Sequence, residues 1–378
     1  MEIYLDNSAS TKPIDEAINA AVYVMAQEYG NPSSLHRKGW KAEQVLTNAK
    51  SQLAKALSCD KNEIVFTSGA TEANNLGIIG LCMANVRRGK RIVTTAIEHP
   101  SVMQALESLE KHGFTIVKLE PNEDKEYVPI DFFNAVDEDT ILVCAMYVNN
   151  ETGLILPIED IAKAVKKKNP NTAVFVDAVQ GFMKLPIKLK NSSIDLMSIS
   201  GHKVYAPKGI GALYIKRGVR ILPQMYGGGQ QNGIRPGTEP LPMIAAFGAA
   251  VEAQSGCMIE MDLHYKALKE HFTQQVINNP NIKINSKSGW ADYIISIAIS
   301  GIRSEVMLHF FEQFEIYVSS GSACAKGKHS YVLSSLGISK ETADETIRIS
   351  FARDTTKQMV DELIIRLNQG IDTLAKKR

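Results

Sequence analysis

The sequence predicts an α/β protein with a mostly parallel, seven-stranded sheet and helices on both faces, followed by a smaller C-terminal α/β domain. Two observations support this. Short β-rich runs alternate with helical patterns through the first 200 residues. A second group of strand-like runs follows a Gly- and Pro-rich loop at 227–240. With 378 residues and 44% hydrophobic content, the chain is long enough to form two domains.

The strands expected in the large sheet are rich in β-branched and apolar residues: 63–67, 91–95, 115–119, 141–147, 173–177, 194–200 and 211–215. Helical patterns lie between them, several opened by Ser, Thr or Pro: about 14–28, 39–57, 71–88, 101–112 and 158–168. Only ten residues separate the last two strands, which is too few for the crossover helix of a parallel pair. We therefore expect the strand at 211–215 to run antiparallel.

The C-terminal region opens with a long helical pattern over about 241–276. Strands are expected at 293–300, 316–320 and 346–350, and a closing amphipathic helix at about 355–375. We place the domain boundary inside the long helix, near residue 255. The large domain is then 15–254, and the small domain combines 1–14 with 255–378.

Composition argues against several classes of partner. Lys and Arg number 42 against 41 Asp and Glu, so the net charge of +1 provides no field that would concentrate nucleic acid or anionic lipid. Acids at Glu2 and Asp6 precede any apolar run, and no stretch approaches the length of a membrane span. The cysteines are odd in number and without a CxxC pair: Cys59, Cys82, Cys144, Cys257 and Cys324. We expect a cytoplasmic protein with free thiols and no metal, no direct nucleic-acid partner and no membrane contact.

Several common signatures are missing from the sequence: the nucleotide-binding motifs GxxxxGK[ST] and GxGxxG after a strand, the zinc-protease motif HExxH and the hydrolase motif GxSxG. What remains is a set of polar residues at strand ends, where open α/β sheets bind ligands. The first is the segment 68–72, SGATE, between a strand and a helix. A helix N-terminus of this kind is a natural phosphate cradle. An ordinary turn capped by Thr71 is the alternative.

A carboxylate and a lysine follow two later strands. Asp177 and Gln180 come at the end of AVFVD, and Ser200, His202 and Lys203 at the end of IDLMSIS. This pairing matches a pyridoxal-phosphate site, with Asp177 on the pyridinium nitrogen and Lys203 as the Schiff-base lysine. A surface lysine in a hairpin is the alternative, since Lys208 stands nearby.

Eight segments in register resemble one family: SGATEANN, AIEHPSV, YVNNETG, VDAVQ, SGHKVYAPKGIGALY, RPGT, SSGSAC and IRISF. Their order and spacing are similar to those of the NifS- and IscS-like cysteine desulfurases, within the class V aminotransferases, over nearly the whole chain. The resemblance implies the fold type I architecture of pyridoxal-phosphate transferases. It also implies a homodimer in which each active site takes residues from both subunits.

The resemblance also implies roles for individual residues. Contacts to the cofactor phosphate are implied for Ala70, Thr71, Ser200, His202 and, from the neighbouring subunit, Thr238. His99 is placed over the pyridine ring as a stacking partner and acid–base group. A structural loop residue is the alternative. Asn150 and Gln180 are placed beside the phenolic oxygen and the substrate. Arg348 is expected to grip the substrate carboxylate, the alternative being a surface charge on a strand.

Cys324 determines the predicted reaction. It lies in SSGSACAKGK at 319–328, a run of small residues in which Lys326 and Lys328 favour the nucleophilic thiolate. We expect Cys324 to take sulfur from L-cysteine as a persulfide, leaving L-alanine, while Lys203 moves the Cα proton. A cysteine without a role in a flexible turn is the alternative.

The resemblance implies that an acceptor protein then takes the sulfur, either an iron–sulfur scaffold or a tRNA-thiolation enzyme. Ala206, Ala352 and Ala325 depart from the family pattern, which leaves the subgroup and the acceptor open. Two rival functions remain. An aminotransferase, a lyase or a selenocysteine-directed enzyme of the same fold would use Lys203 without needing Cys324. A scaffold or regulatory protein would keep only the fold, and the full set of reacting residue types argues against it.

Overall fold

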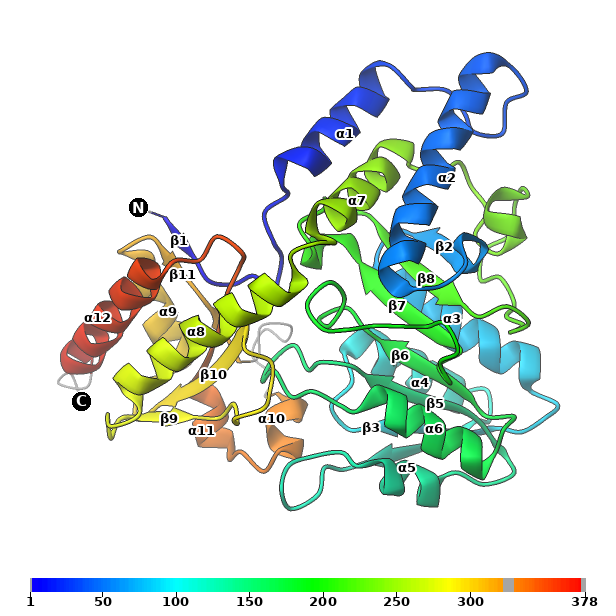
Figure 1. Ribbon diagram of the computed structural model, residues 1–378. Helices are drawn as coiled ribbons and strands as arrows, with labels where there is room; N and C mark the ends of the chain where they lie inside the picture. The colour runs from blue at the N-terminus through cyan, green and yellow to red at the C-terminus, as the bar shows by residue number, and fades with distance from the viewer. Residues whose placement is uncertain (1, 322–329, 375–378) are drawn as a thin grey trace.

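The computed structural model describes residues 2–321 and 330–374, and its largest element is a seven-stranded sheet (Figure 1). The strands follow the order β2-β8-β7-β6-β5-β3-β4. Their bounds are Ile64–Thr67 (β2), Arg91–Thr95 (β3), Thr115–Leu119 (β4), Thr140–Met146 (β5), Ala173–Asp177 (β6), Leu196–Ser200 (β7) and Gly211–Ile215 (β8). Strand β8 is antiparallel to both of its neighbours, and the other pairs are parallel. The predicted fold class and the antiparallel strand are both confirmed.

Helices cover both faces of this sheet. They are Asp15–Ala26 (α1), Arg37–Leu57 (α2), Ala70–Asn85 (α3), Pro100–Glu110 (α4), Pro129–Ala135 (α5), Ile158–Lys168 (α6) and Leu241–Gln254 (α7). Neighbouring residues of a strand enter different cores, because side chains alternate across a sheet. Val143 packs in the cluster that contains α2, α6 and α7, and Cys144 packs in the cluster that contains α3 and α4.

A second, four-stranded antiparallel sheet has the order β12-β13-β10-β9. Its strands are Ile282–Ile284 (β9), Ile294–Ile299 (β10), Ser319–Ser320 (β12) and Thr346–Ser350 (β13). The helices of this region are Met258–Val276 (α8), Ser304–Glu312 (α9), Tyr331–Ser335 (α10), Lys340–Asp344 (α11) and Lys357–Leu374 (α12).

The N-terminus packs with the C-terminal region. Strand β1, Ile3–Tyr4, pairs in parallel with β11, Ile316–Tyr317. Ile3 and Leu5 belong to the apolar core that the C-terminal strands and helices share. This shared core supports the division into 15–254 and 1–14 with 255–378, which stays a prediction.

Two segments differ from their predictions. The single helix expected at 241–276 is two helices, α7 and α8, with a break at 255–257. Gly256 has low helix propensity, and Cys257, with φ −108° and ψ 3°, lies outside the helical region. The strand expected at 316–320 is two short strands, since β11 pairs with β1 while β12 pairs with β13.

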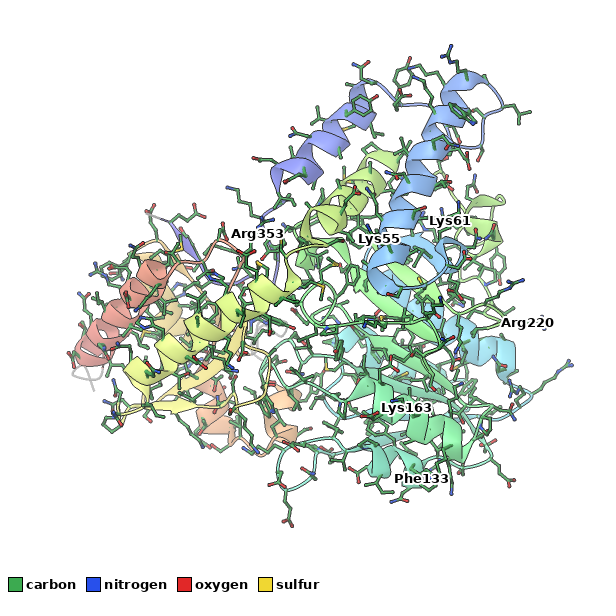
Figure 2. The ribbon with its side chains drawn as sticks, in the orientation of Figure 1. Lys55, Lys61, Phe133, Lys163, Arg220 and Arg353 are labelled. Carbon is green, nitrogen blue, oxygen red and sulfur yellow. The ribbon has the colours of Figure 1, made fainter. Side chains whose placement is uncertain are left out.

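Exposed cations labelled in Figure 2 stand on separate elements: Lys55 on α2, Lys61 before β2, Lys163 on α6, Arg220 after β8 and Arg353 after β13. Within residues 2–321 and 330–374, every helix is too short or too polar to cross a membrane.

The topology brings several strand ends to one edge of the large sheet. Strands β2 and β7 are both antiparallel to β8 and are therefore parallel to each other. The carboxyl ends of β2, β5, β6 and β7 thus lie on the same side. Residues that follow these strands, among them Asp177 and Ser200, are brought together there.

Close packing of α3 on the sheet yields a stability prediction. A Cβ atom at Gly77 would lie 2.8 Å from the Phe175 ring and 3.2 Å from the Leu213 side chain. We expect Gly77→Val to lower the free energy of unfolding by about 1–3 kcal/mol through overpacking, measured by urea denaturation. Gly256→Val, where nothing lies within 4 Å of the added Cβ, is the control. Equal stability of the two variants would contradict this account of α3 packing.

Candidate active site

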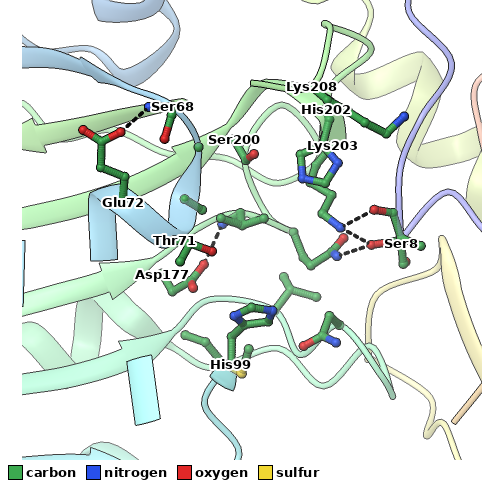
Figure 3. A pocket seen from close by; sticks show the side chains of 18 of the residues that line it. Ser8, Ser68, Thr71, Glu72, His99, Asp177, Ser200, His202, Lys203 and Lys208 are labelled. Atoms are coloured by element: carbon green, nitrogen blue, oxygen red, sulfur yellow. Dashed lines mark hydrogen bonds between the residues drawn. The ribbon is translucent and has the colours of Figure 1, made fainter. Parts of the chain in front are cut away.

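A cavity of about 530 Å³ opens at the edge of the sheet where the strands end (Figure 3). Its lining includes most of the residues that the sequence singles out: Ala70, Thr71, His99, Asn150, Asp177, Gln180, Ser200, His202, Lys203 and Arg348. These residues come from both parts of the chain, since Arg348 lies on β13 of the smaller sheet. The predicted clustering is therefore present in one cavity.

One predicted residue, Thr238, does not line this cavity, and another lies outside the described residues. Thr238 is exposed, in the loop that precedes α7. Its predicted role requires a second subunit and stays a prediction. Cys324 falls within 322–329, outside the described residues.

The first turn of α3 has the features of an anion cradle. Gly69 occupies the N-cap position without a side-chain cap, so that backbone N–H groups of the turn are left for a ligand. Thr71 lies inside the helix, which rules out the alternative that it is the cap. At Gly211 a Cβ would come within 2.7 Å of the Gly69 Cα, so the loop needs glycine opposite it on β8.

Asp177 ends β6 and is 5% exposed. Asn74 Nδ2 donates to its Oδ2 at 3.0 Å, and the Val179 N–H donates to its Oδ1 at 3.1 Å. Asn74 also donates to Ser101 Oγ at 2.8 Å, which ties α3 to α4. The carboxylate is consequently held in one orientation at the floor of the cavity.

Lys203 lies in the short 3₁₀ turn Gly201–Lys203 that follows β7. Its Nζ donates to the carbonyl oxygens of Ser8 at 2.5 Å and Ala9 at 2.7 Å (Figure 3). Gln180 Nε2 also donates to the Ser8 carbonyl, at 2.9 Å.

The two histidines of the cavity are held neutral at physiological pH. Burial lowers the pKa of His99, the charge of Lys203 lowers it further, and Asp177 opposes the shift. Burial, with the charges of nearby lysines led by Lys203, lowers the pKa of His202 to about 4. The Ser101 N–H donates to His99 Nδ1 at 3.2 Å, so the neutral ring carries its proton on Nε2.

Arg348 is 4% exposed and uses two of its nitrogens within the protein. Nη1 donates to the Asn150 carbonyl at 2.9 Å, and Nη2 pairs with Asp6 Oδ1 at 2.7 Å. Its buried Nε has no hydrogen-bond partner among the described residues. The guanidinium has five N–H donors, of which these two bonds use two, and Arg348 lines the cavity, so it can bind an anion there.

Several residues around the cavity were not predicted: Asp6, Ser8, Ala9, Asn74, Glu98 and Glu151. Ser8 and Ala9 act through backbone carbonyls, which leave no trace in side-chain chemistry. The sequence alone marks Asp6 only as an acidic residue near the N-terminus. Glu98 and Glu151 are next in sequence to the predicted residues His99 and Asn150, and this adjacency is the signal that could have identified them.

Both glutamates are buried carboxyl groups. Burial raises the pKa of Glu98 to about 8, with a further contribution from Asp177. Its Oε1 accepts from Thr95 Oγ1 at 2.6 Å and from the Met146 N–H at 2.8 Å. Burial likewise raises the pKa of Glu151 to about 7, and Ser330 Oγ donates to it at 2.5 Å.

Comparison with known proteins places the chain in a family. The model of the class-V aminotransferases matches residues 3–363. The chain belongs to the class-V aminotransferase family. Its relatives include a cysteine desulfurase of Trichormus azollae, 38% identical over 98% of this chain and 93% of that protein. The cysteine desulfurase IscS of Rickettsia typhi is 38% identical over 100% of this chain and 92% of that protein.

Solved structures agree with this class-V membership. A NifS-like protein superposes with a TM-score of 0.92 at 32% identity, over 99% of this chain and 100% of that one. The structure of SspA in complex with cysteine has a TM-score of 0.81 at 32% identity, over 93% of this chain and 99% of that one.

The class-V aminotransferase family depends on pyridoxal 5'-phosphate, and the cavity suits that cofactor. The uncapped turn of α3 suits the phosphate, and the fixed carboxylate of Asp177 suits a pyridinium nitrogen. The Lys203 amine lies in the same cavity. The buried Gln180 Oε1 lacks a partner among the described residues, as expected of a ligand-facing group.

The raised pKa of Glu98 predicts a pH-dependent stability. Between pH 4.5 and about 8 the folded protein keeps this proton while the unfolded chain loses it, so stability falls as pH rises through this window. The effect is limited to about 1.4 kcal/mol for each unit of pKa difference. We expect Glu98→Gln to lose less stability than the wild type between pH 5 and pH 8, measured from urea unfolding midpoints. Parallel pH profiles would show that Glu98 keeps an ordinary pKa.

Proposed function

We propose that this chain is a pyridoxal-phosphate-dependent cysteine desulfurase that converts L-cysteine to L-alanine and holds the sulfur as a persulfide on Cys324. The observation that carries the proposal is that Lys203, Asp177 and Arg348 line one cavity. Relatives named cysteine desulfurase, 38% identical over nearly the whole chain, support it.

The proposed cofactor contacts follow the walls of the cavity. Ala70, Thr71, Ser200 and His202 would hold the phosphate, with Thr238 of a second subunit, and Asp177 would face the ring nitrogen. When bound, pyridoxal phosphate supplies an electron sink that stabilises negative charge at the substrate Cα. The neutral ring of His99 stacks on the cofactor in this proposal, beside Asn150 and Gln180.

The proposed chemistry divides among three side chains. Arg348 binds the substrate carboxylate and fixes the direction of the Cα–H bond. Lys203 holds the cofactor covalently and, once released, removes the Cα proton as a general base. The Cys324 thiolate attacks the substrate sulfur, and the S–Cβ bond breaks as the S–S bond forms. The Cβ carbon takes a proton and Cα regains the proton that Lys203 removed, which leaves L-alanine and the persulfide.

The persulfide needs an acceptor, because the sulfur remains covalently bound to the chain. We propose a partner protein of iron–sulfur cluster assembly or of tRNA thiolation. The name of the Rickettsia typhi relative, IscS, supports this class of acceptor. A cytoplasmic location is part of the proposal, and the free thiols of the described cysteines suit a reducing compartment.

A homodimer is part of the same proposal. Helix α1 and the start of α2 project from the body of the molecule in Figure 1, and they carry exposed apolar side chains. These are Ile18 (43%), Val22 (53%), Tyr23 (55%), Met25 (54%) and Trp40 (59%), with Tyr226 (88%) in the loop that leads to Thr238. Exposed apolar side chains on a projecting helix are typical of an interface, and a second copy would bring Thr238 to its neighbour's cavity.

The catalytic proposal is tested with Cys324→Ala and Lys203→Ala. Cys324→Ala should keep its cofactor but lose persulfide formation from L-cysteine, because the sulfur has no acceptor thiol. Lys203→Ala should lose the covalent cofactor adduct that borohydride reduction leaves in the wild type, and activity should fall about a hundredfold or more. Mass spectrometry of the chain and assay of L-alanine measure both.

Lys190→Ala, which replaces an exposed lysine outside the cavity, is the matched control and should behave as the wild type. If Cys324→Ala forms persulfide normally, the sulfur carrier is assigned wrongly. An aminotransferase or lyase that uses Lys203 then becomes the better proposal. If the wild type yields no borohydride-fixed adduct, the enzyme proposal itself fails.

The dimer is tested with Val22→Asp and Tyr23→Asp. A charge within the exposed face of α1 should convert the dimer to monomer, because burying an unpaired carboxylate is costly. Sedimentation velocity measures the mass. Ile259→Asp, at a residue of α8 that is 81% exposed, is the control and should leave the dimer intact. Dimers in every variant would place the interface elsewhere.

A further inference from the structure

The guanidinium of Arg348 is held at both of its terminal nitrogens. Asn150 and Asp6 occupy Nη1 and Nη2, while the buried Nε has no partner among the described residues. Arg348 also lines the cavity. A guanidinium has five N–H donors, and the bonds to Asn150 and Asp6 use two of them, so its remaining donors are available to an incoming carboxylate.

The fold fixes the position of Asp6. Its backbone forms a β-bridge with Ser350, which stands two residues after Arg348 on β13. The next two residues also bind Ser350. Asn7 Nδ2 donates to the Ser350 carbonyl at 3.0 Å, and the Ser8 N–H donates to Ser350 Oγ at 2.8 Å. The Asp6 carboxylate therefore approaches Arg348 from a fixed backbone rather than from a mobile loop.

We infer that Asp6 is a positioning residue that holds the guanidinium of Arg348 in place at the cavity and so selects ligands that carry a carboxylate. The inference rests on the proposed function, in which that carboxylate belongs to the amino-acid substrate. Arginine suits this arrangement because its rigid planar fork turns as one unit. A bond that fixes Nη2 therefore also fixes the direction of the other N–H donors.

The negative charge of Asp6 has an opposing effect, because it repels an incoming carboxylate. Glu151 also stands within the field of Arg348, but burial raises its pKa to about 7 and favours its neutral form below that pH. Asp6 is in direct contact with the guanidinium, so Arg348 largely neutralises its charge toward a third group. Loss of the Nη2 bond, in contrast, frees a side chain that must be oriented to bind. Removing Asp6 should therefore weaken carboxylate binding.

The test compares two ligands of the holoprotein that differ in the carboxylate alone, L-alanine and ethylamine. Binding is followed by the change in visible absorbance of the bound cofactor, so no turnover is required. Asp6→Ala should weaken L-alanine binding by about tenfold, and Asp6→Asn, which keeps an oxygen acceptor, by about threefold. Ethylamine affinity should be unchanged in both variants. Glu2→Ala removes an exposed carboxylate of the same segment and should match the wild type.

The possible outcomes distinguish failure of the inference about Asp6 from failure of the proposed function. If the wild type binds L-alanine no better than ethylamine, the proposed carboxylate site at Arg348 fails. If the wild type prefers L-alanine and both Asp6 variants keep or strengthen that preference, the role of Asp6 is overturned and the desulfurase proposal stands. If the Asp6 variants lose affinity for both ligands equally, Asp6 has a merely structural role, and its positioning role is also overturned. If Asp6→Ala does not retain cofactor, Asp6→Asn decides alone.

Discussion

Parallel pairing of β5, β6 and β7 is the constraint on which the rest of the molecule depends. These strands are buried on both faces, so their interiors are almost entirely apolar. Polar residues are admitted where the strands end, and parallel pairing puts those ends at one edge. Asp177 and Lys203 are brought together for this reason, although neither is near the other in the sequence.

A second requirement is that the smaller sheet meet that edge. The N-terminal segment provides the connection, because it pairs with the smaller region through Ser350 and faces the cavity through Ser8 and Ala9. Arg348 on β13 reaches the same cavity and is bound to Asn150 from the loop that follows β5. The site is therefore assembled from two cores, and neither core contains it alone.

Hydrophobic periodicity and loop length were enough to predict most of the fold. Ten residues between β7 and β8 required an antiparallel pair, and the structure has one. The same reasoning missed the break at Gly256, because one glycine changes an apolar pattern little while it weakens a helix considerably. Residue type at strand ends, together with a family resemblance, predicted most of the residues that line the cavity. It did not predict Asp6, whose partner Arg348 is far away in the sequence, or Glu98, whose side chain is completely buried.

The bonds between Lys203 and the carbonyls of Ser8 and Ala9 have a consequence for the evolution of such a site. Every amino acid carries a carbonyl, so replacement of either side chain leaves both acceptors in place. Sequence drift at these two positions is compatible with an unchanged environment for the lysine. A survey that ranks positions by residue identity would undervalue this segment, whose contribution lies in the path of the backbone.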